Sequence, residues 1–262
     1  DIKVSRGTTN SAMLLFDSKY TAGGNMFPLS GGNKITYHNK KNYLLSATLN
    51  GPATINQAVG QIPLKLNSKV EFSMKGIAGA KLADNTAIEN KGVKLVCQTT
   101  SYEFDVEFDA LGRLSSMTTA EDAKWSIGNG EVHLPAKTDL FFKGGYLARA
   151  KCTAPTEVSI AGQTFSVVAH KKNASLEFKK ANELNAIVVG DGHTVEVAGY
   201  TVSVEAGSQL GVLYDGVNYG ITSVVTANPI TVDVTKGSKV KSVDAKASKR
   251  LIIKEGKVVK VK

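Results

Sequence analysis

The sequence has little of what most metal, redox and membrane proteins depend on. Of 262 residues, two are cysteine, one is tryptophan, and aromatic residues make up only 7%. The two cysteines, Cys97 and Cys152, do not form a CxxC pair, which argues against a zinc or thiol-redox motif. No run approaches about 18 consecutive apolar residues, so we expect no membrane span.

Cys97 and Cys152 leave two alternatives open. In an oxidising compartment they could close one large loop, which the chain-entropy model values at about 3–4 kcal/mol. They could equally be two buried, unpaired thiols, because a free cysteine behaves as a small apolar residue.

Arginine is also scarce, since only four of the 32 basic residues are Arg and the others are Lys. Arginine makes most of the bidentate hydrogen bonds to phosphates and base edges, whereas lysine acts as a hydrated point charge. The composition therefore argues against a specific nucleic-acid partner.

Catalytic motifs are missing as well. The sequence contains no HExxH, no glycine-rich phosphate loop and no GxSxG. Its four histidines include no two at metal-ligand spacing on one element. We expect no catalytic site, no cofactor and no metal site, and therefore predict that the protein is not an enzyme.

Strand signals dominate the residues that are present. Short β-branched or aromatic runs recur every eight to twelve residues and are separated by Gly, Asn, Asp or Pro, which is typical of all-β proteins. The best helix candidate is 118–125, which would form one or two turns.

An internal repeat is the clearest organisational signal. Residues 158–169 align without gaps on residues 195–206, an offset of 37 residues. Each copy predicts a hairpin with an Ala-Gly turn, in which glycine supplies the positive φ that such turns favour. A degraded third copy begins at Val232, and a weaker echo lies at 132–140.

These patterns predict an all-β chain of two domains. Residues 1–152 would form a β-sandwich or barrel, and residues 153–262 a smaller β-domain of repeated hairpin units with basic C-terminal strands. The alternative is a β-solenoid in the C-terminal part, because HTVEVAGYTVSVEAGSQLGVL, residues 193–213, is similar to the rungs of secreted β-helical proteins.

One segment alternates aromatic or apolar residues with acids. From Tyr102 to Asp109 the pattern predicts a strand with four carboxylates on one face. Those carboxylates belong to Glu103, Asp105, Glu107 and Asp109. The string FDALGRL, residues 108–114, resembles one unit of the YD/Rhs repeats, which implies a hairpin at this point and no function.

Positive charge is concentrated at the C-terminus. Residues 236–262 hold ten basic and two acidic residues, so they carry +8 of the net +9. They could protect an edge strand, bind a polyanion, or meet the acidic face of another copy and generate rings or filaments. The contact residues expected for the last two functions are Lys249, Arg250, Lys254, Lys257, Lys260 and Lys262.

The sequence therefore favours an extracellular or virion-surface structural protein, a homo-oligomeric subunit of a fibre, appendage or adhesin. The alternative is a binding module for an acidic polymer or glycan. A third hypothesis is a β-helical polysaccharide-acting enzyme, which a cleft lined by several carboxylates would indicate.

Overall fold

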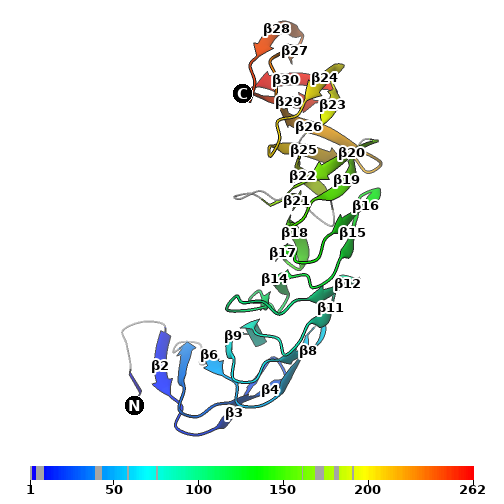
Figure 1. The fold of residues 1–262 in the computed structure, drawn as a ribbon. Coiled ribbons are helices and arrows are strands. Elements are labelled where there is room, and N and C mark those ends of the chain that lie inside the picture. Colours follow the sequence, from blue (N-terminus) through cyan, green and yellow to red (C-terminus); the bar gives the residue numbers. More distant parts are fainter. Residues whose placement is uncertain are drawn as a thin grey trace. The chain divides into compact units, whose positions relative to one another are not determined.

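The computed structural model of this chain describes residues 2–3, 9–38, 43–57, 59–74, 76–160, 162–168, 174–179, 183–190 and 192–262. These residues form strands and turns and no helix (Figure 1), so the expected all-β class is confirmed. None of them forms a helix that is long and apolar enough to cross a membrane.

The chain divides into two compact units. Unit 1 comprises Asp1–Glu121 and Asp139–Tyr146, and unit 2 comprises Asp122–Thr138 and Leu147–Lys262. The strands of unit 1 are β1 (Ile2–Lys3), β2 (Thr9–Met13), β3 (Ser18–Ala22), β4 (Asn25–Leu29), β5 (Lys34–His38), β6 (Tyr43–Thr48), β7 (Ala53–Gln57), β8 (Gly60–Leu64), β9 (Lys69–Ser73), β10 (Gly76–Ala80), β11 (Thr86–Asn90), β12 (Val93–Cys97), β13 (Val106–Phe108), β14 (Leu114–Thr118) and β17 (Asp139–Lys143).

Unit 2 contains the remaining strands, except that the first residue of β18 belongs to unit 1. They are β15 (Ala123–Ile127), β16 (Gly130–Leu134), β18 (Tyr146–Lys151), β19 (Thr156–Ile160), β20 (Gln163–Val167), β21 (Leu176–Phe178), β22 (Leu184–Val188), β23 (Thr194–Val197), β24 (Tyr200–Ser203), β25 (Gln209–Tyr214), β26 (Tyr219–Val225), β27 (Ile230–Lys236), β28 (Lys239–Ala245), β29 (Arg250–Lys254) and β30 (Lys257–Val261).

Each unit has an open main sheet. In unit 1 its order is β1-β2-β5-β6-β9-β10-β13-β14-β17, and every pairing is antiparallel. In unit 2 the order is β18-β21-β22-β25-β26-β29-β30-β27-β28, and only β27 and β30 are parallel. The described strands do not close into a barrel, so the barrel form of the N-terminal prediction is not present in them.

Side hairpins alternate with the main-sheet strands along the chain. In unit 1 the hairpins β3–β4, β7–β8 and β11–β12 stand in a row, with β4 beside β7 and β8 beside β11 (Figure 1). In unit 2 the hairpins β15–β16, β19–β20 and β23–β24 have the same form, and β16 lies beside β19. One repeat is therefore a main strand, a side hairpin and a second main strand.

Consecutive repeats are joined by a reciprocal pair of backbone hydrogen bonds, which we call the seam. Ser30 N donates to Thr48 O at 2.9 Å, and Asn50 N donates to Pro28 O at 3.2 Å. The same arrangement recurs four more times, and the two residues whose N–H groups donate are Lys65 and Ala83, Gln98 and Ala120, Val168 and Gly190, and Glu205 and Ala227. Because an unpaired buried backbone group is costly, each seam favours one alignment of neighbouring repeats.

The hairpins bury the alternating apolar residues that period-two patterning predicts. In unit 1, Phe27 of β4 packs edge-on against Phe72 of β9 with ring centroids 5.2 Å apart, which joins a side hairpin to the main sheet. In the β23–β24 turn, Ala198 and Gly199 both have positive φ, 51° and 81°, as a type I′ hairpin requires.

The repeat predicted from sequence is confirmed, and it is more extensive than expected. The aligned segments form the equivalent hairpins β19–β20 and β23–β24, and the degraded copy at Val232 forms β27–β28. Equivalent hairpins also occur throughout unit 1. They share the backbone arrangement of the aligned segments but not their sequence similarity. The helix expected at 118–125 is wrong, because β14 ends at Thr118 and β15 begins at Ala123. The domain boundary at residue 152 stays a prediction.

Candidate functional site

A long connection interrupts the regular repeats of unit 1. Residues 30–33 and 65–68 make short links from a side hairpin back to the main sheet, whereas residues 98–105 make a link twice as long. In unit 2, residues 135–138 form a short link of the same kind, and the longer connection 168–175 lies partly outside the described residues. Insertions in repeat proteins tend to fall on one face and often serve binding.

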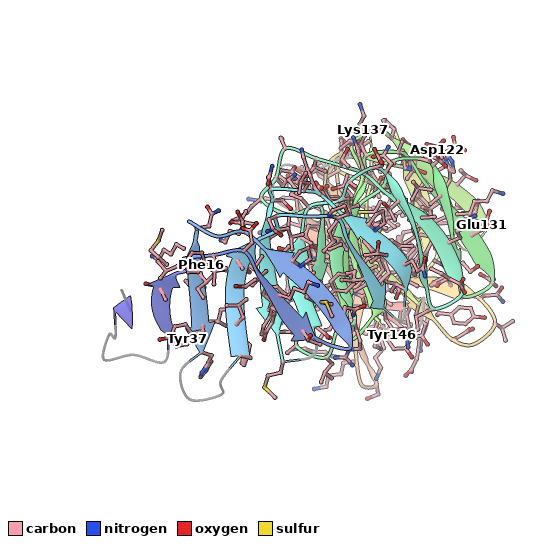
Figure 2. The ribbon with its side chains drawn as sticks, turned by 90° about the horizontal axis from the view of Figure 1, so that it is seen from below. Phe16, Tyr37, Asp122, Glu131, Lys137 and Tyr146 are labelled. Carbon is pink, nitrogen blue, oxygen red and sulfur yellow. The ribbon has the colours of Figure 1, made fainter. Side chains whose placement is uncertain are left out.

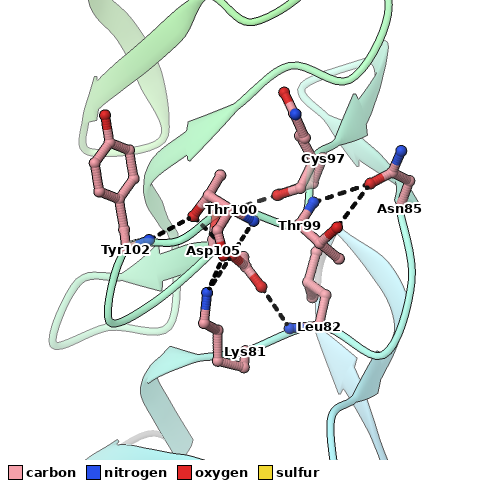
Figure 3. A network of polar contacts seen from close by, with 9 residues as sticks. Lys81, Leu82, Asn85, Cys97, Thr99, Thr100, Tyr102 and Asp105 are labelled. Atoms are coloured by element: carbon pink, nitrogen blue, oxygen red, sulfur yellow. Dashed lines mark hydrogen bonds and ion pairs between the residues drawn. The ribbon is translucent and has the colours of Figure 1, made fainter.

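A buried carboxylate holds this loop, which we call the 98–105 loop. Asp105, only 4% exposed, accepts hydrogen bonds from Lys81 Nζ at 2.9 Å and Leu82 N at 3.0 Å. It also accepts from Thr100, through its N at 2.6 Å and its Oγ1 at 2.8 Å. Figure 3 shows these bonds converging on Asp105 beneath the loop. Lys81 Nζ also donates to Thr100 O.

This network fixes the part of the loop that faces solvent. Tyr102 N donates to Thr100 Oγ1 at 3.2 Å, while the Tyr102 side chain is 61% exposed (Figure 3). The Phe104 ring lies over Gly79 of β10, where a Cβ atom would stand only 2.8 Å from the ring. Glycine at position 79 therefore makes room for Phe104 on the outer surface of the sheet.

A groove of about 500 Å³ lies beside this loop. Its walls include Glu71, Tyr102, Glu103, Phe104, Glu107, Ser116, Asp139 and Phe141. Across the sheet, Glu71 and Glu107 flank Gly79, and Glu107 is followed by Ser116. The floor of the groove therefore follows one row of residues across four neighbouring strands, with the Phe104 ring over Gly79.

Several carboxylates line the groove, which is the feature named above as an indicator of the enzyme hypothesis, and each of them has a partner within unit 1. Lys69 Nζ lies 2.8 Å from Glu103 and 3.5 Å from Glu71, and the hydrogen bond to Glu103 raises the pKa of Lys69. Glu107 accepts a hydrogen bond from Ser116 Oγ, and Asp139 accepts one from Thr118 Oγ1 at 2.8 Å. Each carboxylate still has lone pairs available for further donors.

The predicted acidic strand face is corrected by this geometry. The strand β13 contains only residues 106–108, and Asp105 points into the protein because it pairs with Lys81. Asp109 lies in the following turn, where it accepts from Arg113 Nε at 2.7 Å. Only Glu103 and Glu107 reach the groove. The hairpin implied at 108–114 is present as β13–β14.

The basic residues at the C-terminus do form a common surface in unit 2, which we call the basic face. On the hairpin β29–β30, Arg250 pairs with Lys262, Ile252 with Lys260, and Lys254 with Lys257. Directly opposite residues share a face of an antiparallel pair, so five cations lie together. Lys254 is 3.6 Å from Glu255. Lys249 is exposed in the turn before β29 and lies outside this set.

The two cysteines are buried, free thiols. Cys97 forms an isolated β-bridge with Thr119. Leu29, Leu64 and Val167 have the same position in the corresponding bridges of other repeats, so the thiol occupies an apolar core position. Burial, together with the charge of Asp105, raises the pKa of Cys97 to about 12. Burial also raises the pKa of Cys152.

Other titratable groups show no catalytic arrangement in the part of the chain that the structure describes. His133 Nε2 lies 3.2 Å from Asp122 Oδ2, but both side chains are more than half exposed, unlike a catalytic dyad. His193 Nε2 accepts a hydrogen bond from Ser166 N at 3.1 Å and thus has a structural partner. The described His, Cys, Asp and Glu residues form no group of three that could hold a metal ion.

The groove was missed because its residues come from separate repeats. Glu71 and Asp139 are far apart in the sequence, and Lys81, which directly follows β10, is 24 residues before its partner Asp105. The available signal was the length of the 98–105 loop, which becomes visible only when all the repeats are aligned. Comparisons with family models, curated proteins and solved structures found no match to this chain.

We predict that Asp105→Asn destabilises the protein by about 3–5 kcal/mol, because the half-buried Lys81 ammonium loses its buried counter-charge. Urea denaturation followed by circular dichroism measures the change. Glu131→Gln is the control, since its pair with Lys124 is exposed and contributes about 1 kcal/mol or less. Equal effects of the two substitutions would show that the Asp105 network does not stabilise the fold.

The thiols give a pH-dependent prediction. The unfolded thiols lose their protons near pH 9, whereas folded Cys97 keeps its proton up to about pH 12. The unfolded state then binds fewer protons, so the free energy of unfolding should fall as pH rises above about 9. Cys97→Val should weaken this dependence. Iodoacetamide at pH 8 should label the denatured protein only, and rapid labelling of the native protein would contradict this account.

Proposed function

We propose that this chain is a structural subunit that associates with copies of itself, as in the fibres, appendages and adhesins on cell or virion surfaces. The observation that carries the proposal is in the first repeat. In later repeats, the surface that faces the preceding hairpin is covered by it. In the first repeat the equivalent surface is exposed to solvent.

The side hairpins show this difference in burial. Ile55 and Ile88, at the centres of β7 and β11, are 0% exposed, as expected for strands that face a neighbouring repeat. Tyr20 has the equivalent position in β3 and is only half-buried. Among the described residues, β3 pairs with β4 alone, just as β7 pairs with β8 and β11 with β12. An earlier hairpin lies beside β7 and beside β11, but the described residues place none beside β3, so its outer edge is available for a further strand.

Two large apolar side chains project beside this edge. Leu15 is 73% exposed, and Phe16, which is labelled in Figure 2, is 79% exposed. Their loop is fixed, because Leu14 N donates to Asn33 O at 3.0 Å and Gly31 N donates to Asp17 Oδ1 at 2.7 Å. A fixed loop loses little entropy on binding, which favours contact through these side chains.

The partner that fits this surface is another repeat of the same fold. Leu15 has the position of Asn50 and Ala83, whose backbone N–H groups donate to the preceding hairpin in the seam. A second copy of this chain supplies such hairpins, and exposed apolar residues next to an open strand edge favour association.

The double substitution Leu15→Asp and Phe16→Asp should weaken self-association at least tenfold, because it places two charges in an apolar contact. Sedimentation velocity over a range of protein concentrations measures the effect. Leu111→Asp with Val217→Asp is the matched control, since both side chains are exposed and apolar but lie in other turns. A wild-type protein that stays monomeric at high concentration would refute the proposal.

The basic face favours a second candidate function, the binding of an acidic polymer or glycan. Five cations on one side of β29–β30 present positive charge along a single strip, with Ile252 among them. Released counterions would drive binding to a linear polyanion. The strip has no aromatic side chain on which bases could stack, which argues against single-stranded nucleic acid.

Changing Lys254, Lys257 and Lys260 to Glu should abolish retention on a heparin column at physiological salt. The same change at Lys236, Lys239 and Lys241 removes equal charge from the tip of β27–β28 and is the matched control. If both triple variants elute equally early, net charge alone explains retention and the basic face is not a binding site.

A further inference from the structure

We propose that the groove beside the 98–105 loop binds an uncharged oligosaccharide. The inference is independent of self-association, because the groove is lined by β9, β13, β14, β17 and the 98–105 loop and not by the first repeat. It assigns a ligand class to the surface of unit 1 where the 98–105 loop interrupts the regular repeat.

The groove has the size of a ligand site and includes aromatic surface. Its volume of about 500 Å³ lies within the range of roughly 300–1,000 Å³ that is common for small-molecule pockets. Tyr102, which is 61% exposed, and Phe104 contribute aromatic surface from the loop. An aromatic ring with a polar edge suits a sugar, which has an apolar ring face and polar rim.

Hydroxyl–carboxylate hydrogen bonds already line the floor. Glu107 accepts from Ser116, and Asp139 accepts from Thr118 at 2.8 Å. An ionised carboxylate has about four lone-pair sites, so each can accept from a sugar hydroxyl as well. The groove therefore offers hydrogen-bond acceptors beside an aromatic wall, which is the combination that a polyhydroxylated ring requires.

A resident cation argues against a cationic ligand. Lys69 Nζ lies 5.9 Å from the centroid of the Phe104 ring, and it forms ion pairs with both Glu71 and Glu103. A ligand ammonium would compete for this same place between an aromatic face and two glutamates. With Lys69 there, the remaining acceptors favour a neutral partner over a lysine-rich peptide.

The Asp105 network holds the aromatic wall in position before any ligand arrives. Six hydrogen bonds fix the base of the loop: four accepted by Asp105, one from Lys81 to Thr100, and one from Tyr102 N to Thr100. A site on a fixed loop pays less ordering entropy on binding. This is a physical reason for burying a charged carboxylate at this point.

Isothermal titration calorimetry with uncharged hexasaccharides tests the proposal. The probes are the β-1,4-linked oligomers of glucose, xylose, mannose and N-acetylglucosamine. We expect at least one to bind the intact chain with a Kd below about 1 mM. Tyr102→Ala should weaken that binding about tenfold, the effect of losing one aromatic contact, and Glu107→Gln should also weaken it.

Tyr146→Ala is the matched control, because Tyr146 is 45% exposed but does not line the groove. It should leave the Kd unchanged, and circular dichroism should show all variants folded. Absence of binding by every probe, or equal binding by wild type and Tyr102→Ala, overturns the proposal. So does tighter binding of a lysine-rich peptide than of any sugar.

The Leu15→Asp, Phe16→Asp variant separates the two proposals. It should bind the sugar as wild type does while losing self-association. Failure of the sugar to bind leaves the self-association result intact, and a monomeric wild type leaves the sugar result intact.

Discussion

The backbone seam between consecutive repeats is the constraint on which the rest of this structure depends. Each hairpin of a repeat presents an edge that must be paired, and the reciprocal bonds at Ser30/Asn50 and their equivalents supply that pairing. The side chains on either side of the seam can then vary widely. Leu29, Cys97 and Val167 all form the same bridge with different partners.

The groove and the basic face both follow from departures from this regular pattern. The 98–105 loop extends one connection, and the ion pair of buried Asp105 with half-buried Lys81 anchors the extension to the sheet. At the C-terminus, β27 turns back to pair in parallel with β30, and the hairpin β29–β30 carries its cations outward. Binding surfaces thus arise where the repeat is modified.

Sequence patterning predicted the strands and the clearest hairpins because alternation is a local signal. It could not predict the number of repeats, since Tyr20, Ile55 and Trp125 occupy equivalent positions with unlike side chains. It also misplaced Asp105: its alternation with Phe104 and Val106 indicates a surface strand, but pairing with Lys81 turns the carboxylate inward. The basic residues were found because their pattern is continuous within one hairpin.

The 98–105 loop has a consequence for how such a chain can diversify. Although that connection is twice the usual length, the seam beside it is intact, with Gln98 N to Thr118 O at 2.8 Å and Ala120 N to Val96 O at 2.7 Å. The architecture therefore separates the backbone seam, which must stay constant, from the connection at 98–105, whose length can change. New recognition surfaces can be added at this connection without altering the framework, as in scaffolds with hypervariable loops.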